Sequence, residues 1–445
     1  MINIHTIGGY NEVGKNMTAL ETKEDTILFD AGLYLPAVVG VQEREKIPTE
    51  KGMRSLGALP DDLYLDKKGL RNKVRGILVS HAHLDHVGAV QYLAPRYNAE
   101  VLGTPFTTEV LKALMEDNKI KIKNQIKSVK PNGSYTIKGK KNYKVEFINM
   151  THSTIQSTMI AVHTPEGVIL YANDYKFDNT PVMGEKPNYK RLKELSKIGI
   201  KALIADCLYA QDDRKTPSEK IARGLLEDVL FTTDNRKSGI IITTFSSHIA
   251  RLKSITDFGK KLNRKIILLG RSLGKYTSAA ERIGKLPFRN EVEVGTYRHQ
   301  VERLLRKANN NKKDYLIVCT GHQGEPGAIL DRISRKKLPY QVSSDDHIIF
   351  SSKTIPTPIN IANKNDLDIR LKKSHARLFD NVHVSGHGGR EDLRDLLKLT
   401  NPEHFIPSHG DLPKLKAGLD LAVEMGYKKN YNVHILSNGK KLTLK

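Results

Sequence analysis

Residues 81–86 of this 445-residue chain read His-Ala-His-Leu-Asp-His, which places three imidazoles and a carboxylate within six consecutive positions. The apolar stretch Gly76–Ser80 precedes them and has the pattern of a buried strand, and the helix-compatible stretch Val87–Tyr92 follows. Neither a protein core nor a solvated surface requires so many imidazoles. Because imidazole and carboxylate groups bind zinc, residues 81–86 predict a metal site at the carboxyl end of a strand.

The composition indicates a large globular protein with a strong excess of positive charge. Lys and Arg number 72 against 49 Asp and Glu, and the formal net charge of +23 favours a polyanionic partner, with nucleic acid as the leading candidate. A basic solvated surface without such a partner is the alternative. The N-terminus lacks a signal-peptide pattern and no apolar stretch approaches the ~18 residues that span a bilayer, so we expect a cytoplasmic protein without membrane contact. Cys207 and Cys319 follow apolar runs and are expected in strands, which leaves metal binding to histidines and carboxylates.

Apolar stretches alternate with amphipathic segments along the chain, which indicates an α/β protein. We expect one helix to start at Thr104-Pro105 and another at Thr216-Pro217, where Thr216 would be the N-cap and Glu219 would close a capping box. The segment 36–73 is charged and weakly periodic, and is either an insertion loop that contacts substrate or partner, or a flexible excursion. Strands are expected at residues 26–29, 144–148, 167–171, 239–242, 265–269 and 346–350.

Further candidate ligands follow apolar stretches elsewhere in the chain. A lone histidine after a strand is most often a structural residue, but several such residues together with residues 81–86 reverse that expectation. In an extended backbone His81 and His83 point to the same side. The complete ligand set implies two metals, which together can hold a hydroxide and stabilise a phosphoryl displacement. The predicted ligands are His81, His83 and His152 for one ion, Asp85, His86 and His409 for the other, and Asp174 as the bridge between them.

Asp30 follows the apolar stretch 27–29 and is expected to orient a ligand or the 81–86 loop from outside the metal shell. A simple loop cap is the alternative for this residue. Two Zn²⁺ ions are expected per chain, although Mn²⁺ also suits these oxygen and imidazole ligands.

Together these residues resemble the metallo-β-lactamase superfamily. The resemblance implies an αββα sandwich, in which two β-sheets lie between helices and the metals lie at one edge. The string at residues 81–86 is specific for that superfamily but not for one chemistry. Lactamases, glyoxalase II-like thioesterases, transfer-RNA 3′-processing enzymes and nucleases share it.

The second half of the chain resembles the β-CASP nucleases of that superfamily. Asp206 after the stretch 203–205, the histidines of 383–389 and His409 in 407–410 correspond to three additional motifs of this group. The resemblance implies a metallo-β-lactamase domain in two parts, residues 1–205 and 376–445, with an inserted β-CASP domain at residues 206–375. A histidine at the last motif is associated with RNA substrates, so His409 favours RNA over DNA.

The resemblance also implies roles for individual residues. His387 is the candidate general acid that protonates the departing 3′ oxygen, and Asp206 would orient it and raise its pKa. The alternative is that His387 merely caps a strand in a glycine turn. Asp85 is counted as a catalytic residue as well as a ligand. In the family, the turn that binds the substrate phosphate corresponds here to His383, Val384, Ser385, Gly386 and His387.

Several turns resemble those of the ribonuclease J family, and the match extends to residues 8–16 and 401–410. These turns lie at 244–248, 270–274 and 320–327, after apolar stretches, and glycines and hydroxyls at such places expose backbone N–H groups that can cradle phosphate. Bacterial members usually carry an additional C-terminal domain, so the chain most resembles the shorter, archaeal type. The residues expected to contact substrate in these turns are Phe245, Ser246, Ser247, Arg271, His322 and Gln323, with a structural role equally open for His322.

The resemblance therefore implies a zinc-dependent ribonuclease J that degrades single-stranded RNA from the 5′ end and prefers a 5′ monophosphate, in RNA decay and maturation. One alternative is a β-CASP endoribonuclease of the polyadenylation-factor type, against which the turn 320–327 speaks. A thioesterase-like hydrolase would explain neither the +23 charge nor the inserted domain, and a silent RNA-binding scaffold would not need a complete ligand set. The expected partners are single-stranded RNA, passing between the two domains, and a second copy of the chain in a homodimer.

Overall fold

The computed structural model describes residues 1–39, 49–355 and 358–444. The chain forms two compact units. The first combines Met1–Asn179, Gly184–Thr216 and Gly386–Lys445, and the second combines Thr180–Met183 with Pro217–Ser385. Both changes of unit come about ten residues later in the chain than the expected boundaries at Asp206 and His375.

Hydrogen bonds explain why the chain stays on the first unit beyond Asp206. The backbone of Tyr209 forms a parallel bridge with Gly389. The amide of Thr216 donates to Asp392 Oδ2 at 2.8 Å, and its hydroxyl donates to the His387 carbonyl at 2.7 Å. Residues 207–216 are therefore fastened to the unit that contains Asp206.

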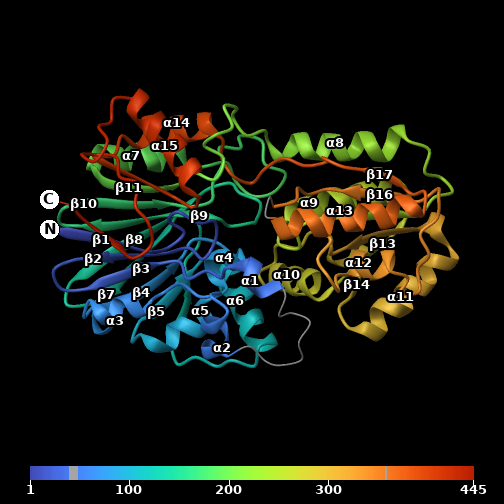
Figure 1. The fold of residues 1–445 in the computed structure, drawn as a ribbon, viewed down its shortest axis with the longest axis horizontal. Helices are drawn as coiled ribbons and strands as arrows, with labels where there is room; N and C mark the ends of the chain where they lie inside the picture. The colour runs from blue at the N-terminus through green and yellow to red at the C-terminus, as the bar shows by residue number, and fades with distance from the viewer. Residues whose placement is uncertain (40–48, 356–357, 445) are drawn as a thin grey trace. The chain divides into compact units, whose positions relative to one another are not determined.

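Two β-sheets pack face to face in the first unit (Figure 1). The strands of the first sheet are β1 (Ile2–Gly8), β2 (Met17–Glu21), β3 (Thr26–Phe29), β4 (Val74–Val79), β5 (Glu100–Gly103), β6 (Ile126–Ser128) and β19 (Lys440–Leu444). Those of the second are β7 (Gly133–Lys138), β8 (Asn142–Asn149), β9 (Thr158–Thr164), β10 (Gly167–Ala172), β11 (Ile200–Asp206) and β18 (His404–Ser408). The sheet orders are β19-β1-β2-β3-β4-β5-β6 and β18-β11-β10-β9-β8-β7. Apolar side chains such as Phe29, Phe147 and Ile204 are fully buried between the sheets.

Helices cover the outer faces of these sheets, which confirms the αββα architecture (Figure 1). On the second sheet, α7, α14 and α15 bury leucines such as Leu192, Leu396 and Leu415. Thr104 is the N-cap of α6 and Pro105 its first residue, as expected. The helices of the first unit are α1 (Leu35–Val39), α2 (Glu50–Ser55), α3 (Leu63–Lys67), α4 (Leu84–Val87), α5 (Val90–Leu93), α6 (Pro105–Asp117), α7 (Tyr189–Ile198), α14 (Arg390–Thr400) and α15 (Leu412–Glu424), with 3₁₀ helices η1 (Arg71–Lys73) and η2 (Ala94–Arg96).

The second unit is built on a parallel sheet of order β14-β13-β15-β12-β16-β17. Its strands are β12 (Ile240–Thr243), β13 (Lys265–Leu269), β14 (Val292–Gly295), β15 (Tyr315–Cys319), β16 (His347–Phe350) and β17 (Arg377–Phe379). Its helices are α8 (Glu219–Thr232), α9 (Ile249–Lys261), α10 (Arg271–Arg282), α11 (Arg298–Asn310), α12 (Ile329–Ser334) and α13 (Pro358–Lys373), with 3₁₀ helices η3 (Arg289–Glu291) and η4 (Lys312–Asp314). Thr243, Leu269 and Cys319 lie in register, so the turns after β12, β13 and β15 begin at one sheet edge.

The expected helix start at Thr216 was wrong. Helix α8 begins at Glu219 with Ser218 as its N-cap, because Thr216 uses its amide and hydroxyl in tertiary hydrogen bonds and Glu219 binds Arg251. The stretch 87–92, expected to be compatible with a helix, contributes Val87 to α4 and residues 90–92 to α5. The segment 36–73, for which an insertion loop and a flexible excursion were both open, contains α2, α3 and most of α1, and its residues 40–48 lie outside the described part. Within the described ranges, every helix is too short or too polar to cross a bilayer.

Candidate metal centre

The ends of strands from both sheets of the first unit deliver the predicted ligands. β4 ends at Val79, immediately before the 81–86 stretch, and the parallel strand β3 ends next to Asp30. In the second sheet, β10 and β18 end just before Asp174 and His409, and β8 ends just before His152. The predicted ligands therefore meet although more than 300 residues of sequence separate the first from the last.

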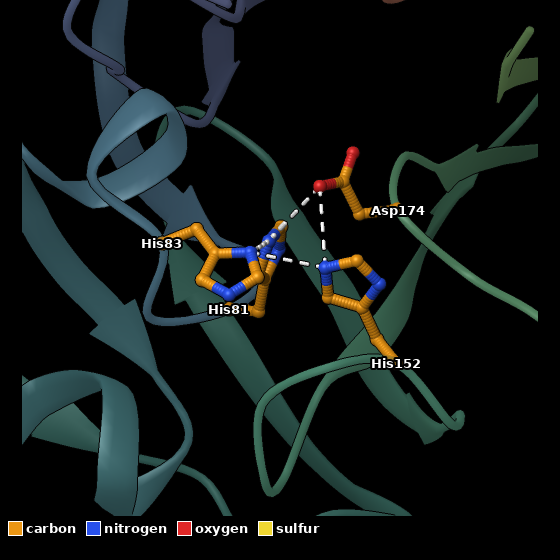
Figure 2. Close-up of side chains that lie close together, drawn as sticks. All are labelled: His81, His83, His152 and Asp174. Atoms are coloured by element: carbon orange, nitrogen blue, oxygen red, sulfur yellow. Dashed lines mark hydrogen bonds and ion pairs between the residues drawn. The ribbon is translucent and has the colours of Figure 1, made fainter. Parts of the chain in front are cut away.

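The first cluster consists of His81, His83, His152 and Asp174, whose ligand atoms face one another in Figure 2. His83 Nδ1 lies 3.1 Å from His81 Nε2 and 3.0 Å from His152 Nε2. The Oδ2 atom of Asp174 lies 3.3 Å from His81 Nε2 and 3.4 Å from His152 Nε2. Four ligands at zinc-binding distances of about 2.0–2.2 Å in a tetrahedron have atoms separated by about 3.3 Å. The cluster therefore has the spacing of a tetrahedral site.

The second cluster consists of Asp85, His86, Asp174 and His409. Asp174 Oδ1 lies 3.3 Å from His86 Nε2 and 3.8 Å from His409 Nε2. Asp85 Oδ2 completes the group at 3.7 Å from His86 Nε2 and 3.9 Å from His409 Nε2. Asp174 thus turns one oxygen toward each cluster, which is the arrangement that a bridging carboxylate requires.

Backbone conformation helps to aim these side chains. Asp30, Asp174 and His409 have φ values of 56°, 57° and 54°, in the left-handed region that residues with a Cβ rarely adopt. Each lies directly after a strand or one residue beyond it. Such conformations cost about 1–3 kcal/mol each and persist at functional sites where the surrounding structure enforces them.

The surroundings of the first-cluster histidines favour the neutral form of each ring. Burial, reinforced by neighbouring imidazoles, lowers the pKa of His81 and places those of His83 and His152 well below the ordinary value. Burial opposes ionisation of Asp174 too, but surrounding histidines outweigh it and hold its pKa well below normal. Neutral imidazoles and an ionised carboxylate are the forms that bind a cation.

Hydrogen bonds to the ring nitrogens that point away from the clusters fix the orientation of His86 and His152. Asp30 Oδ2 lies 2.7 Å from His86 Nδ1, so that nitrogen donates to the carboxylate and Nε2 faces the second cluster. Asp30 also accepts from the Ser80 amide and hydroxyl, at 2.8 and 2.9 Å. His152 Nδ1 donates to the Gly386 carbonyl at 2.6 Å.

Asn16 is a site residue that sequence reasoning missed. Its Oδ1 accepts from His409 Nδ1 at 2.9 Å, and its amide nitrogen lies 3.0 Å from His86 Nε2 and 3.1 Å from the Asp85 carbonyl oxygen. Asn16 therefore contacts three residues of the second cluster. The only signal in the sequence was its position in the stretch 8–16, which resembles the ribonuclease J family.

His387 and Asp206 form a pair next to both clusters. His387 Nδ1 lies 2.7 Å from Asp206 Oδ2, and Asp206, His387 and His409 bring their ligand atoms close together. Burial opposes protonation of His387, but Asp174 and Asp206 outweigh it and raise its pKa to about 9. The second oxygen of Asp206 accepts from the Leu208 amide at 2.7 Å, which fixes the carboxylate. The geometry is that of a protonated imidazole oriented by a carboxylate.

The donor set fits divalent cations. Asp174 Oδ1 is buried and has no hydrogen-bond partner among the described residues. An ionised, buried oxygen without a donor is costly unless a cation satisfies it, and here it lies 3.3 Å from His86 Nε2 and 3.8 Å from His409 Nε2. The residues present therefore suit two metal ions with imidazole and carboxylate ligands.

Most predicted substrate residues of the second unit lie in the turns that follow β12, β13 and β15. The others lie at residues 383–385, where the chain leaves this unit. The Phe245 ring centroid is 4.3 Å from that of His322 and 6.2 Å from that of His383. Arg271 is exposed at the start of α10. The side-chain oxygen of Gln323 is engaged by the Ile355 amide and by Asn360, both at 2.9 Å. Ser246, Ser247, Val384 and Ser385 lie in these segments, and Gly386 and His387 belong to the first unit.

Three family models match the chain in succession. The metallo-beta-lactamase superfamily matches residues 10–212, the beta-CASP domain of Ribonuclease J matches 237–366, and the Zn-dependent metallo-hydrolase RNA specificity domain matches 373–436. Ribonuclease J of Methanocaldococcus jannaschii is 42% identical over 99% of this chain and 98% of its own length. The chain belongs to the ribonuclease J family. Members of the ribonuclease J family are metal-dependent nucleases that bind RNA, and the two ligand clusters agree with metal dependence.

Other relatives agree with membership of the ribonuclease J family. Ribonuclease J of Pyrococcus abyssi is 41% identical over 99% of this chain and 96% of its own length. That of Helicobacter pylori is 29% identical over 98% of this chain and 60% of its own length. A crystal structure of a protein of unknown function from Enterococcus faecalis V583 covers 99% of both chains with a TM-score of 0.66 at 17% identity, which supports the fold alone.

Proposed function

We propose that this chain is a two-zinc 5′-to-3′ exoribonuclease that hydrolyses single-stranded RNA and prefers a 5′ monophosphate, in RNA decay and maturation. The observation that carries the hydrolytic part is the 2.7 Å pair of His387 and Asp206 beside both ligand clusters. The direction and the end preference rest on membership of the ribonuclease J family.

His81, His83 and His152 would hold one ion, Asp85, His86 and His409 the other, and Asp174 both. When bound, such ions supply charge stabilisation for a phosphoryl displacement and lower the pKa of water. Asp206 holds the Nδ1 proton of His387, so Nε2 of the protonated ring is directed toward the clusters, where it lies 3.9 Å from Asp174 Oδ2. From there His387 donates its Nε2 proton to the departing 3′ oxygen.

The test of the chemistry compares the wild type with His387→Ala and His81→Ala on end-labelled RNA, with zinc content measured for each. We expect His387→Ala to keep its zinc and lose about 10²–10⁴-fold in turnover, and His81→Ala to lose zinc as well. The exposed His299→Ala is the matched control and should change neither. Unchanged cleavage by His387→Ala would refute the role of this residue as the acid.

The test of direction compares RNAs of one sequence that carry a 5′ monophosphate, a 5′ triphosphate or no end because they are circular. The proposal requires mononucleotide release, fastest from the monophosphate and absent from the circle. Equal rates on all three would rule out a 5′ exonuclease and leave an endonuclease. Because the net charge is +23, RNA binding should weaken with salt, with a slope of about −0.7 per phosphate contacted.

The predicted substrate contacts in the second unit also remain part of the proposal. Phe245 and His322, which pack against each other, are its best-supported members. The homodimer and the cytoplasmic location remain predictions, and sedimentation velocity would distinguish a single chain of 50.0 kDa from its dimer.

A further inference from the structure

A surface pocket of about 610 Å³ lies in the first unit, and the side chains of its lining residues take no part in the proposed chemistry. It is lined by Leu208, Tyr209, residues 211–214 and Lys414, and is called here the Tyr209 pocket. Its volume is in the range of pockets that hold small organic groups, about 300–1,000 Å³.

The Tyr209 pocket lies beside the His387–Asp206 pair. Its first wall starts two residues after Asp206, where β11 ends, and its second wall is the first turn of α15, which follows His409. β11 and β18 are parallel neighbours with Asp206 opposite Ser408, so both walls leave the same sheet edge. The ring of Tyr209 lies 5.9 Å from that of His387, centroid to centroid. A group in the pocket would therefore adjoin the proposed acid.

The charges of the pocket argue against a phosphate there. Arg214 makes two 2.9 Å hydrogen bonds to the carboxylate of Asp212, and Lys414 is paired with Asp411. Asp213, whose side chain is 91% exposed, is paired with Arg390 at 3.9 Å. The lining cations Arg214 and Lys414 are thus each paired with a carboxylate, and neither is left to balance an incoming phosphate.

The remaining surface suits a flat, uncharged ring with polar edges. Tyr209 offers an aromatic face, Leu208 offers apolar contact, and the exposed amide of Gln211 offers both a hydrogen-bond donor and an acceptor. Proteins recognise unpaired RNA bases by this combination, with stacking on an aromatic ring and hydrogen bonds to the base edge.

We propose that the Tyr209 pocket binds one nucleobase of the RNA close to the scissile phosphate, stacked on Tyr209 and contacted at its edge by Gln211. The inference rests on the proposed function for the identity of the ligand. It assigns the pocket to a base and not to the RNA backbone. Occupation of the pocket would hold the strand in place beside His387 while the leaving oxygen takes up its proton.

The first experiment measures the coupling between Tyr209 and single bases. Single-stranded RNAs with a 5′ monophosphate carry an abasic ribose at successive positions, and kcat/KM is compared with that of the intact RNA. Stacking of one base on an aromatic ring corresponds to about 5- to 150-fold. At one position the wild type and Tyr209→Phe should prefer the base by such a factor, and Tyr209→Ala should lose the preference.

The readout is the ratio of kcat/KM on intact RNA to kcat/KM on abasic RNA. A ratio is needed because Tyr209→Ala also removes a neighbour of His387 and can slow the cleavage of every substrate. Gln211→Ala, a change that leaves Tyr209 in place, should keep the abasic penalty but flatten the preference among the four bases at that position. Tyr431→Ala, whose side chain lies outside the pocket and is 72% exposed, is the matched control and should change neither ratio. An abasic penalty in Tyr209→Ala equal to that of the wild type overturns the inference.

A second experiment does not depend on cleavage. RNA with 2-aminopurine at the sensitive position is bound to protein in EDTA, and its fluorescence should be quenched by the wild type and Tyr209→Phe but not by Tyr209→Ala. Quenching without any cleavage when zinc is restored would refute the proposed function and leave the base pocket standing. Normal cleavage with quenching that is independent of Tyr209 would refute the pocket and leave the nuclease.

Discussion

The side-chain oxygen of Asn16 lies 2.9 Å from Nδ1 of His409, and this contact joins a loop near the start of the chain to the last of the predicted metal ligands. The acceptor fixes the proton of His409 on Nδ1 and leaves Nε2 for the second cluster. The amide nitrogen of the same side chain binds the Asp85 carbonyl oxygen at 3.1 Å.

Replacing Asn16 by alanine should weaken metal binding in the second cluster. We expect a loss of about 10- to 100-fold in zinc affinity, measured by competition with a chelator, because partners that orient a ligand have effects of this size. Asn16→Asp keeps an acceptor for His409 and should recover part of the loss. Asn3→Ala is the control, because Asn3 lies in β1 and its side-chain amide donates to Glu21. Equal zinc affinities for Asn16→Ala and the wild type would contradict this role.

Gly32 should tolerate no side chain. A Cβ at this position would lie 1.6 Å from the Asp85 carbonyl oxygen, so alanine must displace the backbone of the ligand stretch. We expect Gly32→Ala to bind less zinc and to lose at least about 1–3 kcal/mol of unfolding free energy. Gly224→Ala is the control, because a Cβ there meets nothing within 4 Å and alanine favours helix α8 by about 0.5–1 kcal/mol. Normal zinc content in Gly32→Ala would show that the loop can shift without cost.

Glu146 should make stability depend on pH. Burial opposes its ionisation, but hydrogen bonds from Arg191, Lys144 and His163 lower its pKa to about 2. The pKa of Glu146 is lower in the folded than in the unfolded protein. Its contribution to the free energy of unfolding is therefore complete above about pH 4.5 and disappears as the pH falls toward 2. In metal-free protein, Glu146→Gln should cost about 1 kcal/mol in denaturant unfolding at pH 7 and progressively less at lower pH. Glu194→Gln, which removes a more exposed partner of Arg191, should show a smaller difference.

Replacing Arg251 by alanine should destabilise the second unit far more than replacing an exposed arginine of the same unit. It is fully buried, binds both carboxylate oxygens of Glu219, and donates to the carbonyl and hydroxyl of Ser351 at 2.8 Å. Arg251→Ala leaves Glu219 as a buried, poorly compensated charge and should cost about 3–5 kcal/mol in unfolding free energy. Arg298→Ala, whose side chain is 80% exposed, should cost less than about 1 kcal/mol. Similar losses in the two variants would contradict the burial argument.

The sequence singled out the residues that cluster in the structure where its signal was local and dense. His81 to His86 are adjacent in the chain, and the ends of apolar strands located Asp30, His152, Asp174 and His409. Asn16 was missed because an amide in a loop has no distinctive pattern until His409 is placed next to it.

Tertiary contacts also explain the other differences. Thr216 has the pattern of an N-cap, yet Asp392 and the carbonyl of His387 offer it partners that are distant in sequence, so the helix starts later. The left-handed backbone at Asp174 could not be predicted, because the residue type does not favour it as glycine would. The surrounding packing enforces it instead.

Strand β19 closes the first sheet against β1, with Leu444 opposite Ile2, and the ligand His409 comes late in the chain. During synthesis the β1 edge of this sheet therefore stays unpaired until β19 has been made. A ribosome-bound chain that ends before His409 would lack one of the proposed metal ligands. If the proposed function holds, we expect such a nascent chain or a prematurely terminated product to cleave RNA much more slowly than the folded protein.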